Sequence, residues 1–178
     1  MRRIRQLAVS SLLAVTAAAA APAMADASGC AGADRSPAQL GRGGATHTTL
    51  CLLNRERASR GLGRLRLDGK LGRAAQGHAR DMVAKRYFAH DSRSGASFST
   101  RIKRTGWTRS RRSWTVGENI AWGSGSLSTP RAIVRGWMNS AGHRANILSR
   151  SFHLIGIGVA NGTPTGGGGA TYATDFGG

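Results

Sequence analysis

Two histidines and a glutamate stand in three short motifs that can carry chemistry. The motifs are Phe88-Ala89-His90-Asp91-Ser92, Gly117-Glu118-Asn119-Ile120-Ala121 and Trp137-Met138-Asn139-Ser140-Ala141-Gly142-His143-Arg144. Neutral imidazoles at His90 and His143 can hold a divalent transition metal such as zinc. Glu118 can then be a third ligand, a partner of an imidazole or a base for a metal-bound water. The alternative is that both histidines hydrogen-bond across a cleft and that Glu118 accepts from backbone amides or an imidazole.

Other catalytic arrangements find little support in the sequence. No serine has glycines two residues to either side, so a nucleophile elbow is absent. Ser140 and His143 are near one another, but an unactivated serine beside a histidine is common. His78 falls on an apolar helical stripe and is predicted to be a core histidine, while His47 and His153 are predicted to be incidental.

A basic segment follows the first motif and interleaves cations with Trp107 and Trp114, a composition that suits phosphate groups and flat rings. Its candidate polyanion-binding residues are Arg101, Lys103, Arg104, Arg109, Arg111 and Arg112. The alternative is a solvated loop whose two tryptophans pack into the core.

Helices must position these motifs. The domain is predicted to start near Thr46, with a first helix that Thr48 or Thr49 caps and that Gly61 and Gly63 end. Asp68 is predicted to cap a second helix, whose apolar residues recur at helical spacing. They are Leu71, Ala74, Ala75, His78, Ala79, Met82 and Val83. A short helix is expected over 99–105, and another begins with Thr129 as cap and Pro130 in the first turn.

Strands are predicted late in the chain. Residues 153–160 and 171–176 are β-branched and alternate, and the glycine-rich stretch 161–169 between them predicts a hairpin loop. Helices first and strands late indicate an α+β layer fold with an antiparallel sheet.

The N-terminus predicts export. Arg2, Arg3 and Arg5 precede an apolar stretch, and Ala23-Met24-Ala25 forms an A-x-A cleavage site, so 1–25 are predicted to be a signal peptide. We then expect a flexible tail over 26–45 and one domain over 46–178.

Cleavage of the signal peptide removes three arginines, which leaves 23 Lys+Arg against 8 Asp+Glu and a formal charge of +15. Such a charge attracts polyanions, unless it reflects only an arginine-rich genome. No segment after the signal is long and apolar enough to span a membrane.

The two cysteines also bear on the prediction of export. In an oxidising compartment Cys30 and Cys51 are predicted to form a disulfide. The competing interpretation takes Ala27-Ser28-Gly29-Cys30 as a lipoprotein signal with Cys30 acylated.

The motifs in their order along the chain resemble the CAP superfamily of cysteine-rich secretory, antigen 5 and pathogenesis-related proteins, whose module is also called the SCP domain, in a short bacterial form. The resemblance runs from about Leu50 to Phe176. It rests on the three motifs together with Asn54-Arg55, Leu65, Leu71, Tyr87, Ala145-Asn146-Ile147-Leu148, Ile155-Gly156-Ile157-Gly158-Val159 and Phe176.

The resemblance implies an α-β-α sandwich with a cleft lined by two histidines and up to two glutamates. The matching residues are His90, Glu118 and His143, and the cleft is expected to include Asn119 and Ser140. Ser140 stands where many relatives have a second glutamate, and Glu56 and Glu118 are the only glutamates in the chain. A mechanism that needs paired carboxylates is therefore in doubt.

The function predicted from these observations is a secreted CAP-domain binding module, acting outside the cell or at its envelope. Its ligand is expected to be a small lipid-like molecule, a glycan or a metal. One alternative is a metal-dependent hydrolase that uses His90, His143 and Glu118. The other is a polyanion-binding protein that uses the basic face over 101–112.

Overall fold

The structure is a computed structural model that describes residues 29–178, so the predicted signal peptide lies outside the described residues. Its elements are α1 (Pro37–Ala58), β1 (Arg66–Leu67), α2 (Gly69–Ala84), α3 (Phe98–Arg104), β2 (Val116–Gly123), the 3-10 helix η1 (Gly125–Ser128), α4 (Pro130–Asn139), α5 (Ala141–Leu148), β3 (Leu154–Asn161) and β4 (Ala170–Gly177). The strands form one sheet in the order β1-β3-β4-β2.

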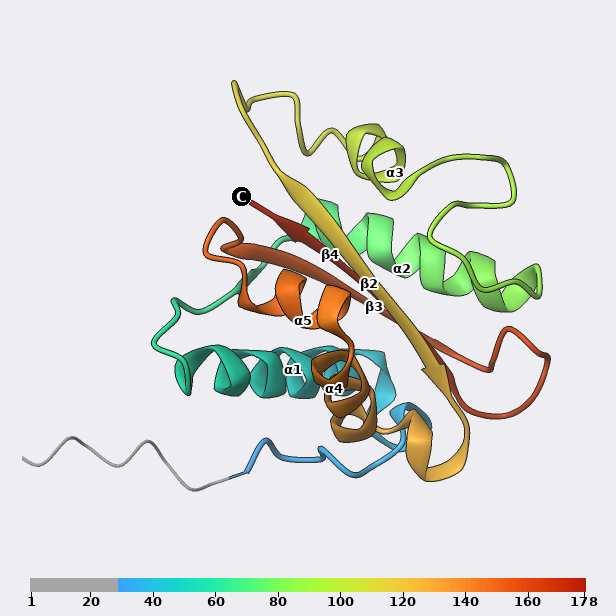
Figure 1. Cartoon of the computed structure of the whole chain (residues 1–178). Coiled ribbons are helices and arrows are strands. Elements are labelled where there is room, and N and C mark those ends of the chain that lie inside the picture. The colour runs from blue at the N-terminus through green and yellow to red at the C-terminus, as the bar shows by residue number, and fades with distance from the viewer. Residues whose placement is uncertain (1–28) are drawn as a thin grey trace, which may run out of the picture.

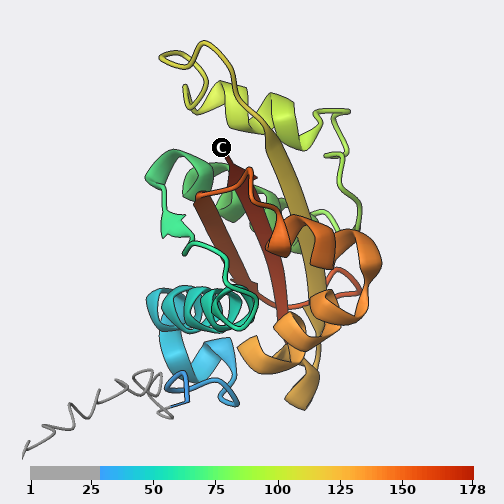
Figure 2. The same cartoon turned by 60° about the vertical axis from the view of Figure 1, so that its left-hand side comes forward.

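The sheet lies between two layers of helices, which confirms the predicted α+β sandwich. Helices α1, α4 and α5 pack together on one face, and α2 covers the other face over β3 and β4 with α3 beside it (Figures 1 and 2). The sheet is mixed, because β1 pairs in parallel with β3 while all other pairs are antiparallel. The predicted hairpin is confirmed by β3 and β4. None of the helices within 29–178 has the length and apolarity needed to cross a bilayer.

Helix α2 lies directly against β3, as its apolar periodicity predicts. The Asp68 side chain caps it by accepting from the backbone N–H groups of Lys70 and Leu71. A Cβ placed on Gly156 would lie 2.0 Å from the Leu71 carbonyl carbon, and one on Gly158 would lie 2.3 Å from that of Ala75. These two glycines therefore set how closely helix and sheet approach.

Helix α1 begins earlier than predicted, and this corrects the expectation of a flexible tail up to residue 45. Ser36 starts the helix through a capping box with Gln39, and Pro37 occupies the first turn. The helix bends at Gly41, whose φ is 67°. The predicted caps are wrong, since the Thr48 hydroxyl donates to the Ala31 carbonyl and the Thr49 hydroxyl donates to the Ala45 carbonyl.

A disulfide joins Cys30 to Cys51 with a Cα–Cα distance of 5.8 Å, as predicted. It fixes the segment before α1 against the middle of that helix. The sulfur of Cys30 is thereby used, and the lipoprotein interpretation, which needs that sulfur for a thioether, is wrong.

Arg57 is a buried cation that the sequence did not single out. Its guanidinium donates to four backbone carbonyls, those of Gly63, Ile147, Ser149 and Phe152, at 2.7 to 3.2 Å. Burial lowers the pKa of Arg57. The side chain thus ties the end of α1 to the end of α5 and the approach to β3.

The second motif forms a strand, which was not among the strands predicted from the sequence. Residues 117–121 lie inside β2, which pairs with β4 along its full length. Asn119 and Glu118 are polar and Gly117 is flexible, so short-range preferences alone disfavour a strand here. Pairing with the β-branched and aromatic residues of β4 provides the stabilisation that the local sequence lacks.

Candidate functional site

The predicted site residues gather around the outer edge of β2. This strand lies at the edge of the sheet, and successive side chains of a strand point to opposite faces. Glu118 faces the layer of α2 and α3, while Asn119 faces α5. The loop that carries His90 and the helix that carries His143 therefore approach one strand from its two sides.

Glu118 is the centre of the site on the first side. Its side chain is 0% exposed. The Nδ1 atom of His90 donates to its Oε1 at 2.8 Å, and Arg101 forms an ion pair with its Oε2. The hydrogen bond with Glu118 raises the pKa of His90. Both carboxylate oxygens are consequently engaged within the protein.

Arg101 belongs to this site and not to a polyanion-binding surface. Its side chain is 10% exposed and pairs with Glu118. The guanidinium also donates to the carbonyls of His90 and Ala96 at 2.8 and 2.9 Å. Arg101 therefore shapes the loop that presents His90, and little of its charge faces solvent.

Asp175 is a second buried carboxyl that sequence reasoning missed. It is the register partner of Glu118 on β4 and is 0% exposed. Neither oxygen finds a hydrogen-bond partner among the described residues. Burial, together with the adjacent charge of Glu118, raises the pKa of Asp175 well above its usual value. Glu118 on β2 and Asp175 on β4 thus form a buried pair of carboxyls across two strands.

His143 occupies the other side of β2. Its backbone carbonyl accepts from the Asn119 side chain at 3.0 Å, and Asn146 donates to the Asn119 side chain and to the Glu118 carbonyl. Burial lowers the pKa of His143, and the nearby charge of His90 lowers it further. Through its hydrogen bonds, Asn119 positions α5 on the strand.

A hollow of about 420 Å³ opens beside His143. It lies between the outer edge of β2, α4 and the segment after α2, and Ser140 and His143 are the polar side chains among its lining residues. Phe88, Trp122 and Leu127, which line it, are 45%, 40% and 61% exposed. Of the five large hydrophobic side chains exposed in the described part of the chain, three belong to this one hollow.

A three-ligand metal centre does not fit these residues. Within 29–178, no three side chains among His, Cys, Asp and Glu come together as a metal site. Glu118 instead holds Nδ1 of His90, the arrangement in which a carboxylate orients an imidazole whose other nitrogen remains available. The site offers two imidazole nitrogens at most.

His78 and the other residues of the basic segment lie outside the site around Glu118. His78 is buried and its Nε2 bonds to the Ala89 carbonyl, as predicted for a core histidine. Trp107 is fully buried beneath Arg111, whereas Trp114 is 37% exposed with Lys103 over its ring. Arg104, Arg109 and Arg112 are exposed.

The sequence profile of the CAP family, the cysteine-rich secretory protein family, matches residues 50–174. The chain belongs to the CAP family. Protein YkwD of Bacillus subtilis is 41% identical over 107 residues, which are 60% of this chain and 39% of YkwD. An extracellular SCP-domain protein from Bacillus anthracis is 30% identical with a TM-score of 0.63, over 76% of this chain and 40% of that one.

A third CAP relative shares the fold at lower identity. The cysteine-rich secretory protein SAV1118 of Staphylococcus aureus is 15% identical with a TM-score of 0.57, over 76% of this chain and 38% of that one. This chain thus spans about two fifths of the length of the relatives it matches. Two of these CAP proteins are described as extracellular or secreted, with which the disulfide is consistent.

Proposed function

We propose that this CAP-domain protein acts outside the cell as a binding module and holds the apolar part of a small amphiphile in the hollow beside His143. The observation that carries the proposal is the gathering of exposed Phe88, Trp122 and Leu127 around one hollow. Its volume of about 420 Å³ lies in the range of small-molecule sites. A lining with two polar side chains favours an amphiphile over a glycan.

The imidazoles suggest the character of the head group. His90 has a raised pKa because of its hydrogen bond with Glu118 and so carries positive charge over a wider pH range. His143 lines the hollow, and burial lowers its pKa. A carboxylate or other anionic head group that reached from the hollow to His90 would be complementary to that imidazole, and the His143 ring could donate a hydrogen bond to it. Export of the protein is supported by the predicted signal peptide and by the disulfide.

The first experiment is a titration of the protein with laurate, followed by intrinsic tryptophan fluorescence. Removing the Trp122 ring takes away part of the apolar lining, and burying such a side chain contributes roughly 1.5–3 kcal/mol, so Trp122→Ala should weaken laurate binding about tenfold or more. Trp114→Ala is the matched control, since Trp114 is similarly exposed but does not line the hollow. Equal affinity in both variants would contradict the proposal.

The hydrolase alternative requires a carboxylate that can take a proton from water. Glu118 has both oxygens engaged and no exposed side-chain surface, which weighs against this role. A hydrolase screen with and without zinc tests it directly. Zinc-dependent turnover that disappears in Glu118→Gln would contradict the binding-module proposal and support a metal-dependent hydrolase.

Metal binding is a second candidate, favoured by the carboxylate that orients His90. His90 and His143 would supply two nitrogens, and two ligands hold zinc in an exchangeable way. The test is a titration of the protein with zinc. Zinc binding that is lost in His143→Ala and kept in His153→Ala would support this role.

A further inference from the structure

A groove runs along the open part of β3, on the opposite edge of the sheet from the His90 site. The strand β1 pairs only with Leu154 and Ile155, so the rest of β3 has no neighbouring strand on that side. Two hollows of about 440 and 560 Å³ lie there between α1 and α2. They share Arg42 and Arg80, and β3 contributes Ile157, Val159 and Ala160 to their lining.

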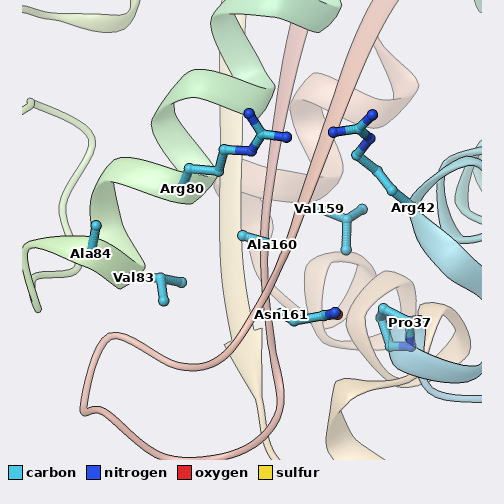
Figure 3. A pocket seen from close by; sticks show the side chains of 8 residues that line it. All are labelled: Pro37, Arg42, Arg80, Val83, Ala84, Val159, Ala160 and Asn161. Atoms are coloured by element: carbon cyan, nitrogen blue, oxygen red, sulfur yellow. The ribbon is translucent and has the colours of Figure 1, made fainter.

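Three arginines line this groove. Arg42 follows the bend of α1 at Gly41, and Arg73 and Arg80 stand two turns apart on α2, roughly 10 Å along the helix. Figure 3 shows the guanidinium groups of Arg42 and Arg80 pointing toward one another across β3. All three arginines are exposed. The positive groups therefore follow the direction of the groove.

These charges are not neutralised by the described part of the protein. No ion pair or side-chain hydrogen bond of Arg42, Arg73 or Arg80 occurs within residues 29–178, and no Asp or Glu lines either hollow. Asp81, which lies next to Arg80 in the sequence, forms its ion pair with Lys85 instead. Three guanidinium groups along one groove, without counter-charges among the described residues, form a site for anionic groups, which arginine can bind through two parallel hydrogen bonds.

We propose that this groove binds a linear polyol phosphate, a polymer with repeated phosphodiester groups and no bases. The repeat of arginines along α2 suits a chain of anionic groups more than a single ion. Single-stranded nucleic acid is usually held on aromatic side chains as well, and no Phe, Tyr or Trp lines the two hollows. An added peptide strand is disfavoured, because the Gln76 side chain already bonds to both the N–H and the C=O of Val159.

The test measures binding of a fluorescently labelled poly(glycerol phosphate) by anisotropy at several salt concentrations. The groove variant carries Arg42→Gln, Arg73→Gln and Arg80→Gln. Loss of three charge-assisted contacts should weaken binding about tenfold or more. It should also flatten the slope of log affinity against log salt by roughly two units.

The matched control carries Arg104→Gln, Arg109→Gln and Arg112→Gln, which removes the same charge from the predicted basic face over 101–112. These arginines are also exposed. The proposal expects less than about a threefold effect in the control, the size of a screened long-range charge effect. Equal losses of affinity in both triple variants would show that polymer binding follows net charge, and would contradict the proposed binding site in the groove.

Two further measurements keep the outcome decisive. An oligo(dT) probe that binds more tightly than the polyol phosphate and loses affinity in the groove variant would replace the proposed ligand with nucleic acid. Far-UV circular dichroism should show a native fold in both triples, and the single variant Arg80→Gln should show part of the same loss. Trp122→Ala should leave polymer binding unchanged, because this inference does not depend on the amphiphile site.

Discussion

Glu118 is held by two side chains of different chemistry, the guanidinium of Arg101 and the imidazole of His90. The hydrogen bond with Glu118 raises the pKa of His90. The neighbouring Asp175 forms no ion pair among the described residues, and burial together with the adjacent Glu118 raises its pKa well above the usual value.

The raised pKa of Asp175 predicts a distinct pH dependence of stability. A carboxyl whose folded pKa is raised binds its proton more strongly when folded, so its contribution to stability is complete below the unfolded value of 3.8 and is lost as the pH rises through the folded pKa. The loss is at most about 1.4 kcal/mol per pH unit. Asp175→Asn removes this titration and should flatten the decline in the free energy of unfolding above about pH 4.

Urea denaturation at a series of pH values checks this prediction. Glu56→Gln is the control, because Glu56 is a partly exposed carboxyl on α1. An unchanged pH profile in Asp175→Asn would mean that Asp175 is ionised in the folded protein.

At the scale of elements, the contact of α2 with β3 depends on two glycines. Any side chain at Gly158 would meet the backbone of Ala75 and Gln76 at 2.3 to 2.4 Å, and a backbone cannot move aside as a side chain can. Gly158→Ala should therefore destabilise the fold by about 1–3 kcal/mol or more, as overpacking of a core does.

Gly77→Ala provides the contrast on the same helix. A Cβ at Gly77 meets no atom within 4 Å, and alanine is the better helix former. This variant should gain roughly 0.5–1 kcal/mol. Thermal unfolding of the two variants gives both values, and a stable Gly158→Ala protein would mean that α2 can move away from the sheet.

For the whole molecule, the disulfide fixes the N-terminal segment on the helical layer. Cys30 and Cys51 are 21 residues apart, and closing a loop of this size stabilises a fold by about 3 kcal/mol in the chain-entropy description. Replacing both cysteines by serine should lower the free energy of unfolding by this order. Chemical denaturation of the double variant, compared with the oxidised and the reduced wild type, measures this change. If the free energy of unfolding falls by nearly zero, the disulfide that fixes the segment before α1 adds nothing to stability.

Much of this architecture could be predicted from local sequence signals. The periodicity from Leu71 to Val83, the Thr129-Pro130 start of α4 and the hairpin around Gly166–Gly169 each act over a few residues, and the structure confirms them. The start of α1 was also encoded locally by Ser36, Pro37 and Gln39, but the glycines that follow obscured it.

What could not be predicted depends on contacts between distant residues. Asp175 reads as one polar residue in a strand, and only its register with Glu118, 57 positions earlier, makes it part of the site. Arg101 looked like a solvated cation until the fold placed it on Glu118. The arginines of the groove come from two helices and form no motif along the chain.

Both outer edges of the sheet carry side-chain partners for the backbone. Gln76 occupies the N–H and C=O of Val159 on β3, while Asn146 and the Trp137 indole occupy the carbonyls of Glu118 and Ile120 on β2. A sheet with guarded edges resists pairing with strands of other molecules, the usual first step of aggregation. A strand of another molecule that approached Val159 on β3, or the carbonyls of Glu118 and Ile120 on β2, would have to displace these side chains before it could extend the sheet there.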